Sequence, residues 1–202
     1  MGRAPSATVD PMGRLIVQET ISADGFAADP EGRTSFMEPF IGGSAEGFAR
    51  RQSELIEGLS GMVMGARTYE GFSAFWPTDA SAGELLAPAL NSLRRYVFSH
   101  SHAEAPWGDL GSCEVVSGDT GEAIRRIKAE SEGDIGCWGS LNLVRELLDL
   151  GEVDELRLVV APSMIGQGRR FGSGGPVQLS LREATTYDDA LVEMVYDLRS
   201  AE

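Results

Sequence analysis

Hydrophobic and polar positions along the chain predict strands that are followed by helices. Residues 14–22 (RLIVQETIS) alternate between two rows, as in a strand with one face better buried than the other. Residues 44–59 place apolar side chains at helical spacing, and Ser44 is suited to cap the start of that helix. Between these segments, residues 26–43 are rich in glycine, proline and acidic residues and predict a long loop.

The order of strand, tight turn and helix returns further along the chain. We expect strands at 61–65, 95–98, 113–116, 134–138 and 154–160, and helices at 67–73, 120–132 and 141–150. Two last strands, at 177–184 and 191–199, have no helix between them and predict a hairpin that turns at residues 187–189. Strands that alternate with helices form a mostly parallel sheet, and the antiparallel hairpin would close its edge. The predicted fold class is therefore α/β, with three α/β/α layers around a mixed sheet.

The length of the chain predicts a single domain. Its 202 residues suffice for one sizeable core and are few for two, and no repeat or linker divides them. Residues 1–13 lack the apolar segment of a secretory signal and are expected to form a flexible leader, which leaves 14–202 as the domain. No apolar stretch approaches the roughly 20 residues that span a bilayer. We therefore expect a soluble, cytoplasmic protein with no membrane partner.

Acidic residues dominate the charge of the chain. Its 31 Asp and Glu residues and 17 Lys and Arg residues give a net charge of −14, which argues against a nucleic-acid partner. A small phosphate-bearing ligand is not excluded, because local N–H groups and one or two arginines can bind it. Two histidines are too few to suggest a zinc site, so no metal is expected. Cys113 and Cys137 lie in apolar runs, where buried free thiols are expected and a disulfide is the alternative.

Three predicted strands end in small or polar residues where a helix or loop begins. These junctions are residues 65–68 (GART), 98–101 (FSHS) and 139–142 (GSLN). Glycine lets the backbone approach a ligand, helix N-termini offer unpaired N–H groups, and Arg67 adds a positive charge. Taken singly, each junction could be an ordinary turn or helix cap. Because the carboxyl ends of parallel strands share one edge, together they predict a small-molecule ligand with several phosphates.

Longer motifs in the same regions resemble a known superfamily. Residues 64–70 (MGARTYE), followed by 75–77 (FWP), resemble the Met-Gly-Arg-x-Thr-aromatic-Glu signature of the dihydrofolate reductase superfamily. Residues 22–26 (SADGF) resemble the Ser-x-Asp-Gly loop of its riboflavin-biosynthesis reductases, the bifunctional deaminase-reductase C-terminal branch. The resemblance implies a dihydrofolate reductase-like fold.

The late part of the chain resembles the riboflavin-biosynthesis branch in particular. Residues 153–156 (VDEL), then Pro162, then residues 166–171 (GQGRRF) are similar to its Asp-Glu-Leu, Pro and Gly-x-Gly-x-x-Phe run. The whole resemblance covers about residues 14–199 in the expected order. It also implies a homodimer that forms through strands of the sheet, and the apolar strand at 155–161 could serve as the contact.

The resemblance implies an NADPH site at the three junctions. The first junction would hold the pyrophosphate and the adenosine phosphate, the second would surround the 2′-phosphate, and the third would cradle the pyrophosphate at a helix N-terminus. The loop 24–27 would close over the nicotinamide, with Thr20 at its inner end. The implied cofactor-binding residues are Thr20, Ala27, Gly65, Arg67, Thr68, Phe98, Ser99, His100, Gly139, Ser140, Leu141 and Asn142.

Two residues depart from the family pattern. Ala66 stands where many relatives carry arginine, so a preference for NADPH over NADH depends on Arg67. Ala49 stands where dihydrofolate reductases place the carboxylate that anchors the pterin, which argues against ordinary folate reduction. Glu46, one turn earlier, could be a catalytic substitute or a surface carboxylate that compensates the helix dipole. Asp24 could order its turn or act as a general acid.

Other side chains have a functional and a structural interpretation. Phe36, Phe48 and Trp76 could cover a planar substrate or belong to the core. Structural roles are expected for the others: core packing beside the cofactor for Trp138, capping and pairing at a strand start for Asp154 and Glu155, and a loop surface for His102.

The residues and the resemblance together predict a hydride-transfer enzyme. We expect an NADPH-dependent oxidoreductase whose substrate is a pterin- or ribosylamino-pyrimidine-like heterocycle, held roughly 3–3.5 Å from the nicotinamide. One alternative, which Ala49 and Ala66 favour, is a protein of the same fold that binds NADPH or another ligand without turnover. A second is an NADPH-dependent reductase of unrelated carbonyl substrates.

Overall fold

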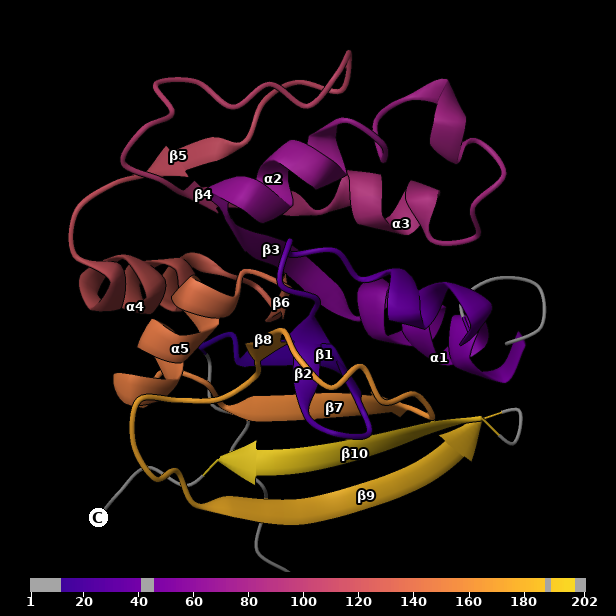
Figure 1. Cartoon of the computed structure of the whole chain (residues 1–202). Helices are drawn as coiled ribbons and strands as arrows, with labels where there is room; N and C mark the ends of the chain where they lie inside the picture. Colours follow the sequence, from indigo (N-terminus) through magenta and orange to yellow (C-terminus); the bar gives the residue numbers. More distant parts are fainter. Residues whose placement is uncertain (1–11, 41–45, 188–189, 199–202) are drawn as a thin grey trace, which may run out of the picture.

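One mixed sheet of eight strands forms the centre of the molecule (Figure 1). The computed structural model describes residues 12–40, 46–187 and 190–198. The strands of the sheet are β1 (Leu15–Ser22), β3 (Leu59–Gly65), β4 (Arg94–Phe98), β5 (Glu114–Val116), β6 (Asp134–Trp138), β7 (Glu155–Ala161), β9 (Leu179–Tyr187) and β10 (Leu191–Leu198). They lie in the order β5-β4-β3-β6-β1-β7-β10-β9. Neighbours from β5 to β7 run parallel, whereas β10 runs antiparallel to both β7 and β9.

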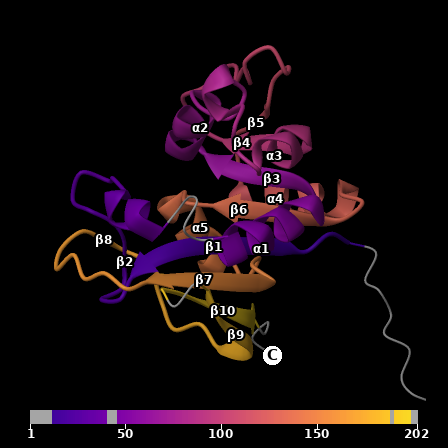
Figure 2. The same cartoon turned by 90° about the vertical axis from the view of Figure 1, so that its right-hand side faces the viewer.

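Helices cover both faces of this sheet (Figures 1 and 2). They are α1 (Glu46–Glu57), α2 (Ala66–Ser73), α3 (Ala87–Ser92), α4 (Thr120–Glu130) and α5 (Leu141–Asp149). The core that packs α4 and α5 against one face contains Val63, and the core under α1, α2 and α3 contains Met62 and Met64. Alternate residues of β3 enter opposite cores because successive strand side chains point to opposite faces. The structure confirms the predicted α/β class, with its mostly parallel sheet and C-terminal antiparallel hairpin.

The region between β1 and α1 is more regular than the predicted loop. It contains β2 (Phe26–Ala28), which pairs with β8 (Arg169–Arg170) in a second sheet, and the 3₁₀ helix η1 (Ser35–Phe40). The prediction of a long loop over 26–43 missed these two elements, because strands of two or three residues are too short to show an alternating pattern, and residues 41–43 lie outside the described residues. Helix α3 and the 3₁₀ helix η2 (Asp79–Ser81) also have no counterpart in the prediction.

Some predicted features lie outside the described residues. They are the proposed N-cap Ser44, most of the leader at 1–13, the hairpin tip at 188–189 and residue 199. Within the described part, the helix predicted over 44–59 ends at Glu57, and Leu59 already belongs to β3.

Strand β7 lies in the interior of the sheet. It pairs with β1 on one side and with β10 on the other over nearly its whole length. Its backbone hydrogen-bonding groups are therefore already used, so residues 155–161 cannot pair edge to edge with a second subunit. The edge strand at this end of the sheet is β9, and the homodimer itself stays a prediction.

Both cysteines are buried free thiols, as predicted. Cys137 lies in the core under α4 and α5, and Cys113 lies in the core on the opposite face. Burial raises the pKa of both thiols, which keeps them protonated and unreactive at neutral pH. Over the ranges that the structure describes, no helix is both long enough and apolar enough to cross a membrane.

Candidate active site at the carboxyl edge of the sheet

The three predicted junctions meet at one edge of the central sheet. Strand β3 lies between β4 and β6, and Gly65 at its end is in register with Phe98 at the end of β4. Helix α2 begins directly after Gly65, and α5 begins shortly after Trp138, the last residue of β6. The segments that the sequence assigns to a phosphate-bearing ligand are therefore adjacent. Their role in binding stays a prediction.

A compact set of hydrogen bonds joins the starts of α2 and α5. The Thr68 hydroxyl oxygen accepts hydrogen bonds from the Ser140 N–H (3.0 Å) and from the Ser140 hydroxyl (2.8 Å). The Ser140 hydroxyl in turn accepts one from the N–H of Gly65 (2.8 Å). We call these three residues the Thr68–Ser140 joint. It fixes the two helix starts against each other at the edge of the sheet.

The joint holds two consecutive residues in the left-handed conformation. Gly139 has a φ of +57°, and Ser140, with a φ of +56°, is the one non-glycine residue in the described ranges with a positive φ. A Cβ atom on Gly139 would lie 3.1 Å from the Thr68 hydroxyl oxygen, so glycine is favoured there by space as well as by backbone. Strained non-glycine residues of this kind are typical of ligand sites.

Helices α2 and α5 both begin without a capping side chain. The N-cap residue of α2 is Gly65, which has none, and the hydroxyl of Ser140 is used by the joint instead of by α5. Helix α4, in contrast, is capped in the usual way: its N-cap residue Asp119 accepts a hydrogen bond from the N–H of Glu122 (2.8 Å). Uncapped helix starts leave N–H groups and the positive end of the helix dipole for an anion.

The segment after β4 is folded back on itself. Ser99 is buried, and its hydroxyl accepts hydrogen bonds from the N–H groups of Ser101 (3.2 Å) and His102 (3.1 Å). The predicted ligand residue His100 is exposed. His102, in contrast, places its ring edge-on against Tyr69 with centroids 5.4 Å apart and its Nδ1 3.0 Å from the Ser99 hydroxyl. His102 lies in a loop, as predicted, but its side chain is only 23 % exposed because its ring packs against Tyr69.

Asp24 ties the end of β1 to the segment that follows β7. Its carboxylate accepts hydrogen bonds from the Ser22 hydroxyl (2.6 Å) and from the N–H groups of Gly166 (2.8 Å) and Ile165 (3.2 Å). The hydrogen bond from Ser22, followed by those from the two N–H groups, holds the pKa of Asp24 below its usual range. A carboxylate that is ionised and occupied in this way does not serve as a general acid. The structure supports the turn-ordering role instead.

The other predicted residues differ in their exposure. Thr20 is half-buried at the end of β1, and Ala27 is buried in β2. Arg67 and Asn142 are exposed in the first turns of α2 and α5, and Leu141 is half-buried. Glu46 is exposed at the first position of α1, which is the arrangement expected for a carboxylate that compensates the helix dipole.

The three aromatic candidates for the substrate site pack against two different cores. Phe36 and Phe48 pack with Val159 in a small core between η1, α1 and the sheet. Trp76 belongs to the separate core under α2 and α3, and its carbonyl oxygen accepts a hydrogen bond from Asn91 (2.7 Å). Trp76 is partly buried against a different core from the two phenylalanines, and a role of the three in substrate binding stays a prediction.

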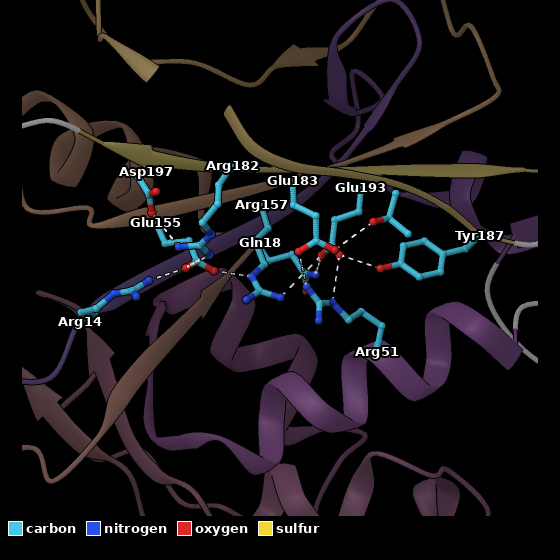
Figure 3. A network of polar contacts seen from close by, with 11 residues as sticks. Arg14, Gln18, Arg51, Glu155, Arg157, Arg182, Glu183, Tyr187, Glu193 and Asp197 are labelled. Atoms are coloured by element: carbon cyan, nitrogen blue, oxygen red, sulfur yellow. Dashed lines mark hydrogen bonds and ion pairs between the residues drawn. The ribbon is translucent and has the colours of Figure 1, made fainter. Parts of the chain in front are cut away.

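A buried polar network under α1 was not predicted. It joins Arg14, Gln18, Arg51, Glu155, Arg157, Arg182, Glu183, Tyr187, Glu193 and Asp197 (Figure 3). Glu193 lies near its centre with only 1 % of its surface exposed. Its carboxylate accepts hydrogen bonds from Gln18 (3.1 Å), from the Tyr187 hydroxyl (3.0 Å) and from Arg51 (3.4 Å). Burial and the neighbouring Glu193 raise the pKa of Tyr187 to about 12.

The network reaches the predicted site through a tryptophan. The Gln18 side chain donates to Glu193 and accepts a hydrogen bond from the indole N–H of Trp138 (2.8 Å). Trp138 precedes Gly139 and packs against the core under α1, α2 and α3, as expected. The signal that could have revealed this arrangement is a polar residue at an inward position of an otherwise apolar strand, as at Gln18 and Glu193.

A second part of the network confirms the predicted pairing at the start of β7. The Asp154 carboxylate accepts a hydrogen bond from the N–H of Leu15 (2.7 Å). Burial alone would raise the pKa of Glu155, yet hydrogen bonds from Arg182, Arg157 and Arg14 hold it below its usual range. These residues link β1, β7 and β9 without reaching the Thr68–Ser140 joint.

Comparison with solved structures identifies proteins of the same fold. A putative riboflavin biosynthesis protein from Shewanella sp. PV-4 is 21 % identical, with a TM-score of 0.73 over 93 % of this chain and 99 % of that one. A diaminohydroxyphosphoribosylaminopyrimidine deaminase/5-amino-6-(5-phosphoribosylamino)uracil reductase from Thermotoga maritima is 13 % identical (TM-score 0.64, 93 % and 57 %). Dihydrofolate reductase from Enterococcus faecalis, complexed with NADP(H), is 14 % identical (TM-score 0.62, 94 % and 98 %). At these identities the likeness establishes the dihydrofolate reductase-like fold.

The family follows from the sequence itself. The model of the family described as the RibD C-terminal domain matches residues 14–192, which include β1, all three junctions, the VDEL motif and most of the C-terminal hairpin. The match agrees with the motifs at residues 22–26 and 153–171. This chain belongs to the RibD C-terminal domain family.

Proposed function

We propose that the protein is an NADPH-dependent reductase that transfers a hydride to an electrophilic carbon of a pterin- or ribosylamino-pyrimidine-like heterocycle. The observation that carries the proposal is the pair of uncapped helix starts that the Thr68–Ser140 joint holds at one sheet edge. Family membership supports the reaction class. The dihydrofolate reductase of the same fold is complexed with NADP(H), which supports the cofactor.

The residues at this edge fit a dinucleotide. Gly65 and Gly139 lack side chains at the points where the backbone would approach the phosphates, and the first turns of α2 and α5 offer N–H donors. The half-buried Thr20 and the buried Ala27 place only small side chains at the nicotinamide end. NADPH would supply the hydride when bound. The protein's own task is to bind it, to orient it and to exclude water.

The proton for the reaction would come from water. Asp24 is ionised and held by three hydrogen bonds, and Glu46 is exposed at the start of α1. Ala49 is the position where dihydrofolate reductases carry their carboxylate, so this chain has no substitute on that helix turn. This pattern favours a heterocycle other than dihydrofolate as substrate.

Removing the acceptor of the joint tests the cofactor site. In Thr68→Val the N–H and hydroxyl of Ser140 lose their shared partner, so the helix starts separate and NADPH is expected to bind about tenfold more weakly. Calorimetric titration with NADPH measures the effect. Thr186→Val, an exposed change of the same kind on β9, is the matched control and should leave the affinity unchanged. Absence of NADPH binding by the unmodified protein would contradict the proposal.

A measurement of turnover distinguishes an NADPH-dependent enzyme from a protein of the same fold that binds NADPH without reaction. Oxidation of NADPH is followed spectroscopically with a deaminated ribosylamino-pyrimidine, with dihydrofolate and with a simple carbonyl compound. We expect turnover with the pyrimidine and little or none with dihydrofolate. Turnover of the carbonyl compound alone would favour a reductase of unrelated substrates. Tight NADPH binding without oxidation in any of the three would favour the binding protein.

A further inference from the structure

The guanidinium groups of two arginines from distant parts of the chain lie beside the same residue, Gly32. A Cβ atom on Gly32 would lie 3.3 Å from the Arg67 guanidinium, in α2, and 3.6 Å from the guanidinium carbon of Arg169, in β8. In the parts of the chain that the structure describes, neither arginine forms an ion pair or a side-chain hydrogen bond. Two unpaired cations thus face the same small region.

Such a pair is unexpected in this chain. Acidic residues outnumber basic ones by 31 to 17, and other arginines, such as Arg33 and Arg182, do pair with carboxylates. The two acidic side chains of the turn around Gly32 already have a partner, because Arg33 binds both Asp29 (2.9 Å) and Glu31 (3.0 Å). Two like charges held close together favour an anion between them.

The fold fixes the backbone that carries Arg169. Arg169 is in register with Ala28 of β2, and a side chain on the preceding Gly168 would collide with the Ala28 carbonyl oxygen. The neighbouring Arg170 stacks on Phe26, 4.3 Å from the ring centre, and donates a hydrogen bond to the Asp24 carbonyl (3.1 Å). Arg170 therefore anchors the β2–β8 pair, while Arg169 remains free to bind a ligand.

We propose that Arg169 and Arg67 together bind the pyrophosphate of the dinucleotide, with Arg169 reaching it from β8. This inference rests on the proposed function and adds a binding residue that lies outside the three junctions. Arg67 belongs to the helix after β3, and Gly32 follows β2 on the β1 side of the sheet. Strand β3 lies between β4 and β1 in the sheet, so the pyrophosphate would pass near Arg67 on its way from the proposed nicotinamide end at β1 to the proposed 2′-phosphate end at β4.

Because both dinucleotides contain the pyrophosphate, loss of Arg169 should reduce the affinity for NADPH and for NADH by the same factor. Arg169→Ala is expected to weaken NADPH and NADH alike, by about tenfold each, so that the ratio of the two dissociation constants stays the same. Arg169→Lys keeps the charge without the planar fork and should lose less, about threefold. Isothermal titration with each nucleotide gives the constants. Arg126→Ala, an exposed arginine on α4, removes the same charge away from the site and should change neither constant.

The outcomes separate this inference from the proposed function. If the unmodified protein fails to bind NADPH, the proposed function itself fails. If it binds NADPH and Arg169→Ala binds both nucleotides as well as the unmodified protein does, only the role of Arg169 is overturned. Weakening of NADPH alone would place Arg169 at the 2′-phosphate and would also overturn the inference. Thermal unfolding of each variant shows whether it is folded.

Discussion

Glu193→Ala is expected to lower the free energy of unfolding by about 3–5 kcal/mol, because it removes the carboxylate that accepts hydrogen bonds from several buried donors and leaves a cavity in its place. The carboxylate is 1 % exposed and is the shared acceptor of Gln18, Tyr187 and Arg51. The substitution also removes the carboxylate that lies 4.0 Å from the guanidinium group of the largely buried Arg157. Urea unfolding followed by circular dichroism gives the change in free energy.

A neighbouring glutamate provides the matched control. Glu183 also binds Arg51 (3.1 Å), but its side chain is 44 % exposed. An exposed ion pair contributes little, so Glu183→Ala should cost less than about 1 kcal/mol. If both variants lost the same free energy of unfolding, burial would not be the reason that Glu193 contributes to stability. The tryptophan emission of Glu193→Ala should also shift, because Gln18 loses the partner that orients it toward Trp138.

Most of the sheet could be predicted because each strand carries its own local pattern. In β3 the side chains of Met62, Val63 and Met64 are all buried between helices, and such short apolar runs bounded by glycine are typical of interior parallel strands. The elements that the sequence did not reveal are short. Strand β8 has two residues, and α3 has six with a proline in its first turn, so neither shows a period.

The site was predictable as three local junctions and not as one arrangement. Gly65 is the last residue of a strand, Ser99 and Gly139 each follow one, and a parallel sheet places such strand ends along one edge. The Thr68–Ser140 joint depends on residues 72 positions apart, so no local pattern contains it. The approach of Arg169 to Arg67 likewise depends on the pairing of β8 with β2. His102 was assigned to the surface because nothing in the sequence shows that its ring meets Tyr69.

Glu19→Met is expected to stabilise the protein at neutral pH by about 2–3 kcal/mol. Glu19 lies in the middle of β1, opposite Leu158 of β7, and is only 8 % exposed. Within the described structure one of its carboxylate oxygens has no hydrogen-bond partner. Burial raises the pKa of Glu19 to about 8, although a hydrogen bond from the Thr20 backbone lowers it in part. Methionine fills a similar volume without a polar group to desolvate.

The gain is expected to depend on pH in a defined direction. The folded-state pKa of about 8 lies above the ordinary glutamate pKa of 4.5, so the folded protein keeps a proton that the unfolded chain releases between these values. The contribution of Glu19 to the free energy of unfolding is therefore at its maximum below pH 4.5, where the residue is protonated in both states. As the pH rises from 4.5 toward 8, this contribution falls by about 1.4 kcal/mol per pH unit. The stability of the unmodified protein should therefore fall relative to Glu19→Met across this range. Glu104→Met, at an exposed position, should show no such divergence. Parallel stability curves for the unmodified protein and Glu19→Met between pH 5 and 8 would mean that Glu19 does not titrate with a raised pKa, and that its carboxylate is solvated in the folded protein.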